Sequence, residues 1–274
     1  MRLFIFFSVF NCNVNIKENI LIGCGGICGS NCGNINIISK CVVNVNGYIS
    51  LFAGGICGYN INTISKCIVK GDISGVNAGG ICGCHCSNTS TISKCIVKGD
   101  ISGVNAGCIC ANGCDVIGTI SKCSVKGNIS GEYAGGITGT YCNDIDTISK
   151  CKFIGNITNR GAGIIGAFYH IRNLVNTTIE KCHVNARLSG QSGGIIGYTF
   201  NFGGNDNKSL IINDCRSVGH CDHTSANIIA PIIESDTLGT SITVSNCEYS
   251  NVITREIPVA GWTYTVTNCK KVRK

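Results

Sequence analysis

The sequence predicts an all-β protein folded as a parallel β-helix (β-solenoid) of about ten coils of ~28 residues each. The first observation is a repeat: the cysteine of a recurrent Ser-Lys-Cys tripeptide returns in the central part of the chain at spacings of 26, 28, 28 and 28 residues. The second is composition, because β-branched Ile and Val dominate the apolar residues and strong helix formers at helical spacing are missing. The third is glycine, with 37 in 274 residues, which supplies bends between short strands.

The best-preserved copy of the repeat runs from Thr91 to Gly107, and the same pattern occurs one period earlier, from Thr63 to Gly79. Apolar and polar residues mostly alternate within it, which predicts short half-buried strands that bend at glycines. The positions expected to face the core are Ile92, Cys95, Val97, Ile101 and Ile109. A propeller blade needs more residues and an antiparallel meander, and leucine-rich repeats need a Leu/Asn ladder that this chain lacks.

We expect a single domain over residues 1–274, because the repeat argues for one continuous solenoid. Within it, residues 1–11 form an N-terminal cap or a leader, 12–200 the regular repeats, and 201–274 irregular repeats and a C-terminal cap. Coils stacked ~4.8 Å apart make a rod roughly 45–50 Å long.

The first ten residues leave two interpretations open. Arg2 followed by eight mostly apolar residues is similar to a signal peptide, but the apolar run is short and no small-x-small cleavage site follows. The segment also runs directly into Asn11–Val14, where the repeat expects a strand. An intracellular location and a secreted surface location therefore both stay open. No stretch reaches the ~18 apolar residues that a transmembrane segment needs.

A glycine element of the form Ala-Gly-Gly-Ile-x-Gly recurs at residues 53–58, 78–83 and 134–139, and as Ser192–Gly197. Together with the Cys-x-Val-x-Gly-x-Ile-Ser segment before it, this element resembles the GLUG repeat of bacterial surface proteins, including the non-catalytic part of immunoglobulin-A-cleaving metallopeptidases. Its cysteine-rich, Asn/Ile/Lys-rich form also resembles repeat proteins of giant DNA viruses of amoebae. The resemblance covers residues 11–200 well and the remainder weakly, and it implies a repeat architecture in a virion or surface component rather than an activity. With the resemblance included, the open locations are the virion or host cytoplasm and a secreted surface.

The 22 cysteines fall into columns. The largest column contains Cys12, Cys41, Cys67, Cys95, Cys123, Cys151, Cys182, Cys215, Cys247 and Cys269. We expect it to be an internal ladder in which cysteine serves as a small apolar residue. A second column follows the recurrent Ile of the glycine element, and a third, formed by Cys32, Cys86, Cys114 and Cys142, falls at an expected corner. Disulfides remain the alternative, with the corner column the better candidate for oxidation.

Two clusters invite a metal interpretation: Cys82–Cys86 with His85, and Cys215 with His220–His223. Zinc sites usually combine two separated pairs of ligands that converge tetrahedrally, and neither cluster has that layout. We therefore expect no metal site and no cofactor.

Carboxylates are few, but Asp72 and Asp100 occupy the same repeat position and should stack on adjacent coils. Stacked carboxylates are the arrangement that β-helix glycosidases and lyases use for acid/base catalysis. Lys70 and Lys98 precede them by two residues on the same face, and neutralisation by these lysines is a sufficient structural explanation. We expect no catalytic residues and no enzymatic activity.

The most specific surface signal is a Thr-x-Ser pattern followed by lysine. The candidate binding face contains Thr63, Ser65, Lys66, Thr91, Ser93, Lys94, Thr119, Ser121, Lys122, Thr147, Ser149 and Lys150, with Thr178 and Lys181 extending it. Two parallel rows of hydroxyls would resemble the flat Thr-x-Thr faces of ice-binding proteins. The lysines argue against that interpretation, and ordinary β-surface Thr and Ser are the simpler alternative.

The net charge of +7 is concentrated partly in the last five residues, and no nucleic-acid-binding motif is present. We expect a non-catalytic structural or adhesive repeat protein that presents regular side-chain ladders to a partner, either another protein or an anionic glycan. The alternatives are an ice-binding protein that uses the Thr-x-Ser face and a carbohydrate-active β-helix enzyme.

Overall fold

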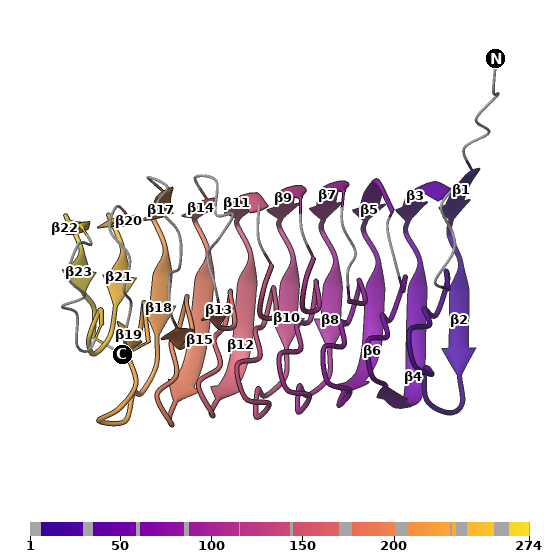
Figure 1. The fold of residues 1–274 in the computed structure, drawn as a ribbon, viewed down its shortest axis with the longest axis horizontal. Helices are drawn as coiled ribbons and strands as arrows, with labels where there is room; N and C mark the ends of the chain where they lie inside the picture. The colour runs from indigo at the N-terminus through magenta and orange to yellow at the C-terminus, as the bar shows by residue number, and fades with distance from the viewer. Residues whose placement is uncertain are drawn as a thin grey trace, which may run out of the picture.

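The structure is a computed structural model that describes residues 7–29, 35–58, 61–84, 88–114, 116–142, 145–169, 177–200, 208–230, 232–233, 240–254 and 263–273. All regular elements in these ranges are β-strands, and they wind into a rod of stacked coils with the two ends of the chain at opposite ends of the rod (Figure 1). The predicted fold class, an all-β parallel β-solenoid, is confirmed.

Two parallel sheets of ten strands each form two sides of the rod. Sheet A consists of β1 (Phe7–Phe10), β3 (Ile35–Ser39), β5 (Thr63–Ser65), β7 (Thr89–Ser93), β9 (Ile117–Ser121), β11 (Ile145–Ser149), β14 (Thr177–Glu180), β17 (Lys208–Asn213), β20 (Thr240–Ser245) and β22 (Thr263–Thr267). Sheet B consists of β2 (Asn13–Ile16), β4 (Val42–Ile49), β6 (Ile68–Ile73), β8 (Ile96–Lys98), β10 (Ser124–Lys126), β12 (Lys152–Ile157), β15 (His183–Leu188), β18 (Arg216–Val218), β21 (Glu248–Tyr249) and β23 (Lys270–Lys271).

The glycine elements form the third side of the rod. Their main chains pair through isolated parallel bridges, such as Gly54 with Gly79 and Cys57 with Cys82. In the C-terminal half this side also carries a three-stranded sheet of β13 (Phe168–Tyr169), β16 (Thr199–Phe200) and β19 (Ile232–Ile233). Strands after Leu210 pair in the same two large sheets as the regular repeats, and β1 pairs with β3 at the other end.

The core consists of columns of Ile, Val and Cys side chains, and each coil contributes one residue to each column. All five positions predicted to face inward in the best-preserved repeat, from Ile92 to Ile109, are fully buried. Each buried residue packs on its equivalent in the next coil because the strands pair in register, as Val69 does with Val97. The alternation in the sequence therefore predicted the inner face correctly.

The Ser-Lys-Cys tripeptide forms the corner between sheets A and B. The middle residue of this tripeptide, or its equivalent in the coils where the tripeptide has changed, has a left-handed backbone conformation with φ between 52° and 58°. These residues are Asn11, Lys40, Lys66, Lys94, Lys122, Lys150, Lys181, Asp214, Asn246 and Asn268. This conformation turns the chain sharply, so that the following cysteine points inward. The Sγ of Cys95 then donates a hydrogen bond to the Ser93 carbonyl oxygen at 3.5 Å, and Cys67 does the same to Ser65 at 3.3 Å.

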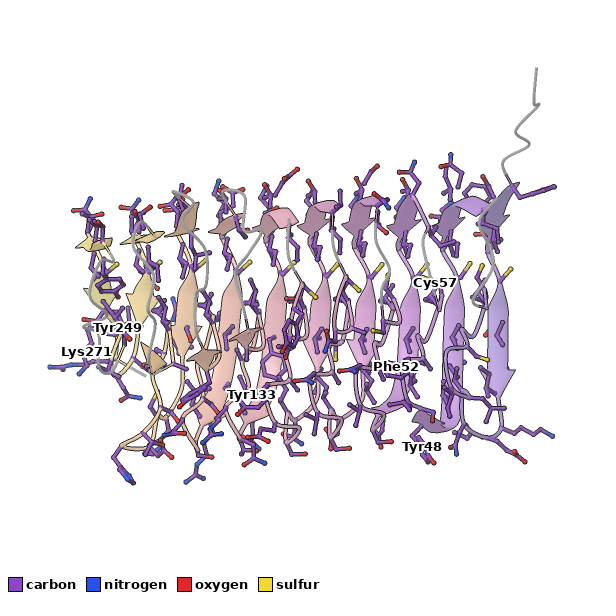
Figure 2. The ribbon with its side chains drawn as sticks, in the orientation of Figure 1. Tyr48, Phe52, Cys57, Tyr133, Tyr249 and Lys271 are labelled. Carbon is purple, nitrogen blue, oxygen red and sulfur yellow. The ribbon has the colours of Figure 1, made fainter. Side chains whose placement is uncertain are left out.

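The main cysteine column is accordingly an internal ladder, and its sulfur atoms recur from coil to coil (Figure 2). Among the described cysteines, all are buried except Cys12, Cys24, Cys221 and Cys269. Cys114 and Cys142 of the expected corner column are buried too, whereas Cys32 and Cys86 lie outside the described residues.

Successive main chains approach too closely for a side chain at several glycines. A Cβ atom at Gly103 would lie 2.1 Å from the carbonyl oxygen of Gly75 in the preceding coil. At Gly29, by contrast, a Cβ atom would meet open space and the backbone needs no glycine. The two glycines differ in whether a neighbouring coil blocks the position.

We expect Gly103→Ala to lower the free energy of unfolding by about 1–3 kcal/mol, because the backbone of the neighbouring coil must shift to admit the methyl group. Gly29→Ala is the matched control and should leave stability near that of the wild type. Thermal unfolding followed by circular dichroism measures both, and an unchanged melting temperature for Gly103→Ala would contradict the close stacking.

Candidate binding face

Sheet A brings the predicted Thr and Ser residues into two straight rows. Strand pairing aligns Thr63, Thr91, Thr119 and Thr147 in one row and Ser65, Ser93, Ser121 and Ser149 in the other, and we call these the hydroxyl rows. They lie on the outer surface because the residue between them in each coil, such as Ile92, is fully buried. Thr178 extends the first row beside Thr147, and Ser39 extends the second beside Ser65.

The two hydroxyl rows differ in how much they offer to a partner. The Thr row is half-buried throughout, whereas Ser39 and Ser149 in the Ser row are 7% and 9% exposed. The Ser39 and Ser65 hydroxyl oxygens are 2.9 Å apart and share a hydrogen bond along the stack. The Ser row is therefore used partly to join coils, and the Thr row forms the more accessible part of the face.

A row of lysines borders the hydroxyl rows at the corner. We define the lysine row as Lys40, Lys66, Lys94, Lys122, Lys150 and Lys181, all of which are exposed. The backbone of each of these lysines is held by a hydrogen bond to the next coil. For example, the Lys66 amide donates to the Ser93 carbonyl oxygen at 2.9 Å. The predicted face did not include Lys40, although the tripeptide Ser39-Lys40-Cys41 carried the same signal.

Among the described residues, most of the lysine row has no carboxylate partner. Within the part of the chain that the structure describes, only Lys181 has a carboxylate at ion-pair distance, Glu180 at 4.0 Å. The other five ammonium groups follow one another at the coil spacing of ~4.8 Å. The edge of sheet A is thus a continuous stripe of positive potential beside a neutral hydroxyl face.

Asp72 and Asp100 do stack, but their carboxylates serve the fold. The Asp100 amide donates to Asp72 Oδ1 at 2.9 Å, and the Asn128 amide donates to Asp100 Oδ1 at 2.7 Å. The next coil continues the pattern, with the Asn156 amide donating to Asn128 Oδ1 at 3.0 Å. Among the described residues no ion pair joins these carboxylates to Lys70 or Lys98.

We expect Asp100→Ala to lower the free energy of unfolding by about 0.5–1.5 kcal/mol, because the Asn128 amide loses its acceptor. Asp100→Asn should keep most of the stability, since Asn128 itself accepts in the same way in the next coil. Urea unfolding of the two variants measures the difference. Equal loss in both, or loss of a glycan-cleaving activity in Asp100→Asn, would contradict a purely structural carboxylate.

The described residues contain no group of three or more His, Cys, Asp or Glu side chains able to hold an ion. His85 and Cys86 of the first cysteine–histidine cluster lie outside those residues. In the second cluster, His220 and His223 are exposed, and the Asp222 carboxylate is hydrogen-bonded to backbone amides. Asp222 accepts hydrogen bonds from the Gly190 amide at 3.0 Å and from the Thr224 amide at 2.9 Å.

Burial raises the pKa of Asp222, but hydrogen bonds from Gly190, Ser225 and Thr224 lower it by a larger amount, so that the pKa is about 2. Because this folded-state pKa lies below the value of about 3.9 in an unfolded chain, Asp222 stabilises the fold above pH ~4 and loses that contribution as the pH falls towards 2. Asp222→Asn, which resembles the protonated acid, should therefore be less stable than the wild type at pH 7 and nearly equal to it near pH 2. Urea unfolding at both pH values tests this, and a difference that does not change with pH would contradict it.

Arg160 builds a cluster that the sequence reasoning missed. Its guanidinium contacts Glu132 Oε1 at 3.0 Å, Tyr133 OH at 2.8 Å, Gln191 Oε1 at 3.0 Å and the ring of Tyr198, whose centroid is 4.8 Å away. The available signal was a break in the repeat, because Tyr133 and Arg160 stand where earlier coils have Asn77 and Asn105. These contacts tie consecutive coils together.

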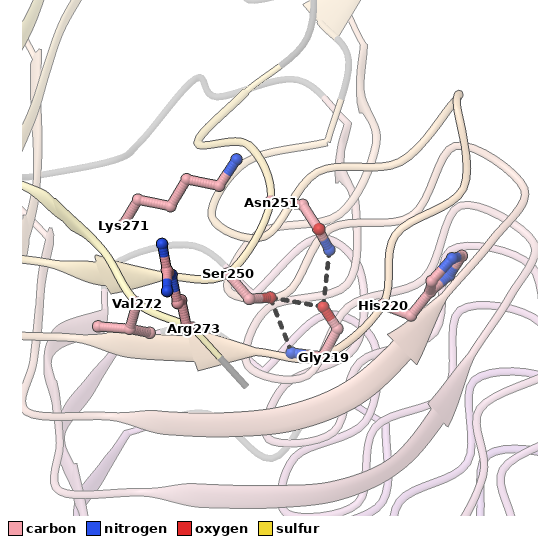
Figure 3. A pocket seen from close by; sticks show the side chains of 7 residues that line it. All are labelled: Gly219, His220, Ser250, Asn251, Lys271, Val272 and Arg273. Carbon is pink, nitrogen blue, oxygen red and sulfur yellow. Dashed lines mark hydrogen bonds between the residues drawn. The ribbon is translucent and has the colours of Figure 1, made fainter.

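A shallow hollow of about 460 Å³ lies near the C-terminal coils, lined by Gly219, His220, Ser250, Asn251, Lys271, Val272 and Arg273 (Figure 3). Its central polar groups bond to one another: the Gly219 amide donates to Ser250 Oγ at 3.0 Å, and Asn251 Nδ2 donates to the Gly219 carbonyl oxygen at 2.7 Å. These bonds join successive coils, which gives the hollow a structural explanation.

Comparison of the chain with protein-family models, curated proteins and solved structures returned no match. The described residues include no helix with the length and hydrophobicity to cross a bilayer.

Proposed function

We propose that this protein is a non-catalytic structural or adhesive protein, a rod that presents ordered side-chain rows to a partner. The observation that carries the proposal is the register of the hydroxyl rows with the lysine row over consecutive coils. A face of this kind is flat and repetitive, so it suits an extended or repetitive partner rather than a small molecule.

Two further features support a non-catalytic role. The carboxylates of Asp72 and Asp100 are engaged with backbone amides of the next coil. The similarity of the glycine elements to GLUG repeats agrees with a place in a virion or at a cell surface. The partner chemistry that fits the face is another protein or an anionic glycan.

The test is a paired variant, Thr91→Glu with Thr119→Glu, which places charge on the accessible Thr row and leaves the core untouched. We expect the wild type to bind at least one member of a panel of immobilised neutral polysaccharides, acidic polysaccharides and surface proteins without releasing new reducing ends. The paired variant should unfold like the wild type and lose that binding. Equal binding by the variant, or release of reducing ends by the wild type, would overturn the proposal.

Ice binding is the second candidate, favoured by the straight Thr row and opposed by the adjacent lysines. Thermal hysteresis of the same two proteins at high concentration separates it from adhesion. Hysteresis in the wild type that the paired variant loses would make ice the partner, and its absence in both removes this candidate.

A further inference from the structure

The lysine row occupies a backbone conformation that lysine does not favour. Its six residues have φ between 53° and 58°, in the left-handed region where Asn, Asp and Gly are the residues most readily accommodated. The same corner in other coils of this chain is made by Asn11, Asp214, Asn246 and Asn268, with φ between 52° and 57°. The corner therefore does not require lysine, and the chain itself shows that shorter polar residues form it.

The lysines also repel one another. Strand pairing places Lys40, Lys66, Lys94, Lys122 and Lys150 above one another at a ~4.8 Å coil spacing, and like charges directly opposite are destabilising. No carboxylate among the described residues lies at ion-pair distance from these five. Backbone strain and charge repulsion thus coincide at five consecutive corners, and strain retained in this way is typical of functional positions.

We infer that the lysine row is a binding site for a linear acidic polysaccharide that lies along the axis of the rod. This inference rests on the proposed function and specifies its partner. Evenly spaced ammonium groups over five coil steps, roughly 24 Å, match an extended polymer with regularly spaced anionic groups. The neighbouring Thr row adds hydroxyls that can bond to sugar hydroxyls at the same spacing.

The face favours a polysaccharide over a single-stranded nucleic acid. Proteins that bind single strands combine a basic groove with aromatic side chains on which bases stack. Strands β5, β7, β9 and β11 contain no aromatic residue, and the cations beside them are all lysines rather than the arginines that suit bidentate phosphate contacts.

A second set of lysines provides a matched control. Lys70, Lys98 and Lys126 stack in register on sheet B, in the same three coils as Lys66, Lys94 and Lys122. They lie in ordinary strand conformation, away from the corner. Removing either set changes the charge of the protein by the same amount in the same coils.

The experiment compares two triple variants of the full chain: Lys66→Asn, Lys94→Asn, Lys122→Asn, and the control Lys70→Asn, Lys98→Asn, Lys126→Asn. The probe is polygalacturonate, with neutral dextran and polyuridylate as comparators, and both affinity and melting temperature are measured. We expect the wild type to bind polygalacturonate with an affinity that falls as salt rises, and the corner variant to lose roughly tenfold or more. The control variant should lose much less, and the corner variant should melt at the same temperature as the wild type or higher.

Four outcomes would overturn the inference. A lower melting temperature in the corner variant would show that the lysines serve the fold. Equal loss of binding in both variants would show that net charge, not the row, attracts the polymer. No binding of polygalacturonate, or tighter binding of polyuridylate, would exclude an acidic polysaccharide as the ligand of the lysine row. The proposed function would still stand if the wild type bound another partner and the Thr91→Glu/Thr119→Glu variant lost that binding.

Discussion

Backbone hydrogen bonds between successive coils hold each position directly above its equivalent in the next coil. The strand pairs of sheets A and B and the bridges between glycine elements all run parallel, and they keep register except for shifts in the β1–β3 and β4–β6 pairs. This stacking sets the close approach of main chains, which is why a Cβ atom at Gly103 would meet the Gly75 carbonyl oxygen at 2.1 Å. It also means that any residue type repeated in the sequence must pack against copies of itself.

Self-stacking suits apolar side chains and creates a problem for charged ones. Ile and Val build a continuous core, and the ladder cysteines fit the narrow space inside the corner while donating to its carbonyl oxygens. Burial, the largest influence, raises the pKa of Cys41 to about 11, so this ladder residue is a neutral thiol at physiological pH. The ladder is therefore compatible with an apolar core.

Stacked polar residues on sheet B are accommodated by hydrogen bonds to the backbone of the next coil. Asp72 and Asp100 direct a carboxylate oxygen to the amide of the next coil, and Asn128 does the same with its side-chain amide oxygen. In the part of the chain that the structure describes, the lysine row has no such arrangement, apart from Lys181 near Glu180. A row of cations that the corner does not require, and that no described carboxylate neutralises between Lys40 and Lys150, is the feature of this surface that most needs a partner to explain it.

The sequence by itself determined the period, the inner face and the columns of stacked residues. Regular spacing and alternation are local properties, so Ile92, Cys95 and the aligned Thr91 and Thr119 could be placed from the chain alone. The tertiary structure alone decided the left-handed conformation of the lysine corner, the acceptor roles of Asp100 and Asp222, and the bracing by Arg160. These features depend on partners in neighbouring coils about one repeat away along the chain, and the direction of a side chain at a corner follows from a backbone conformation that those partners impose.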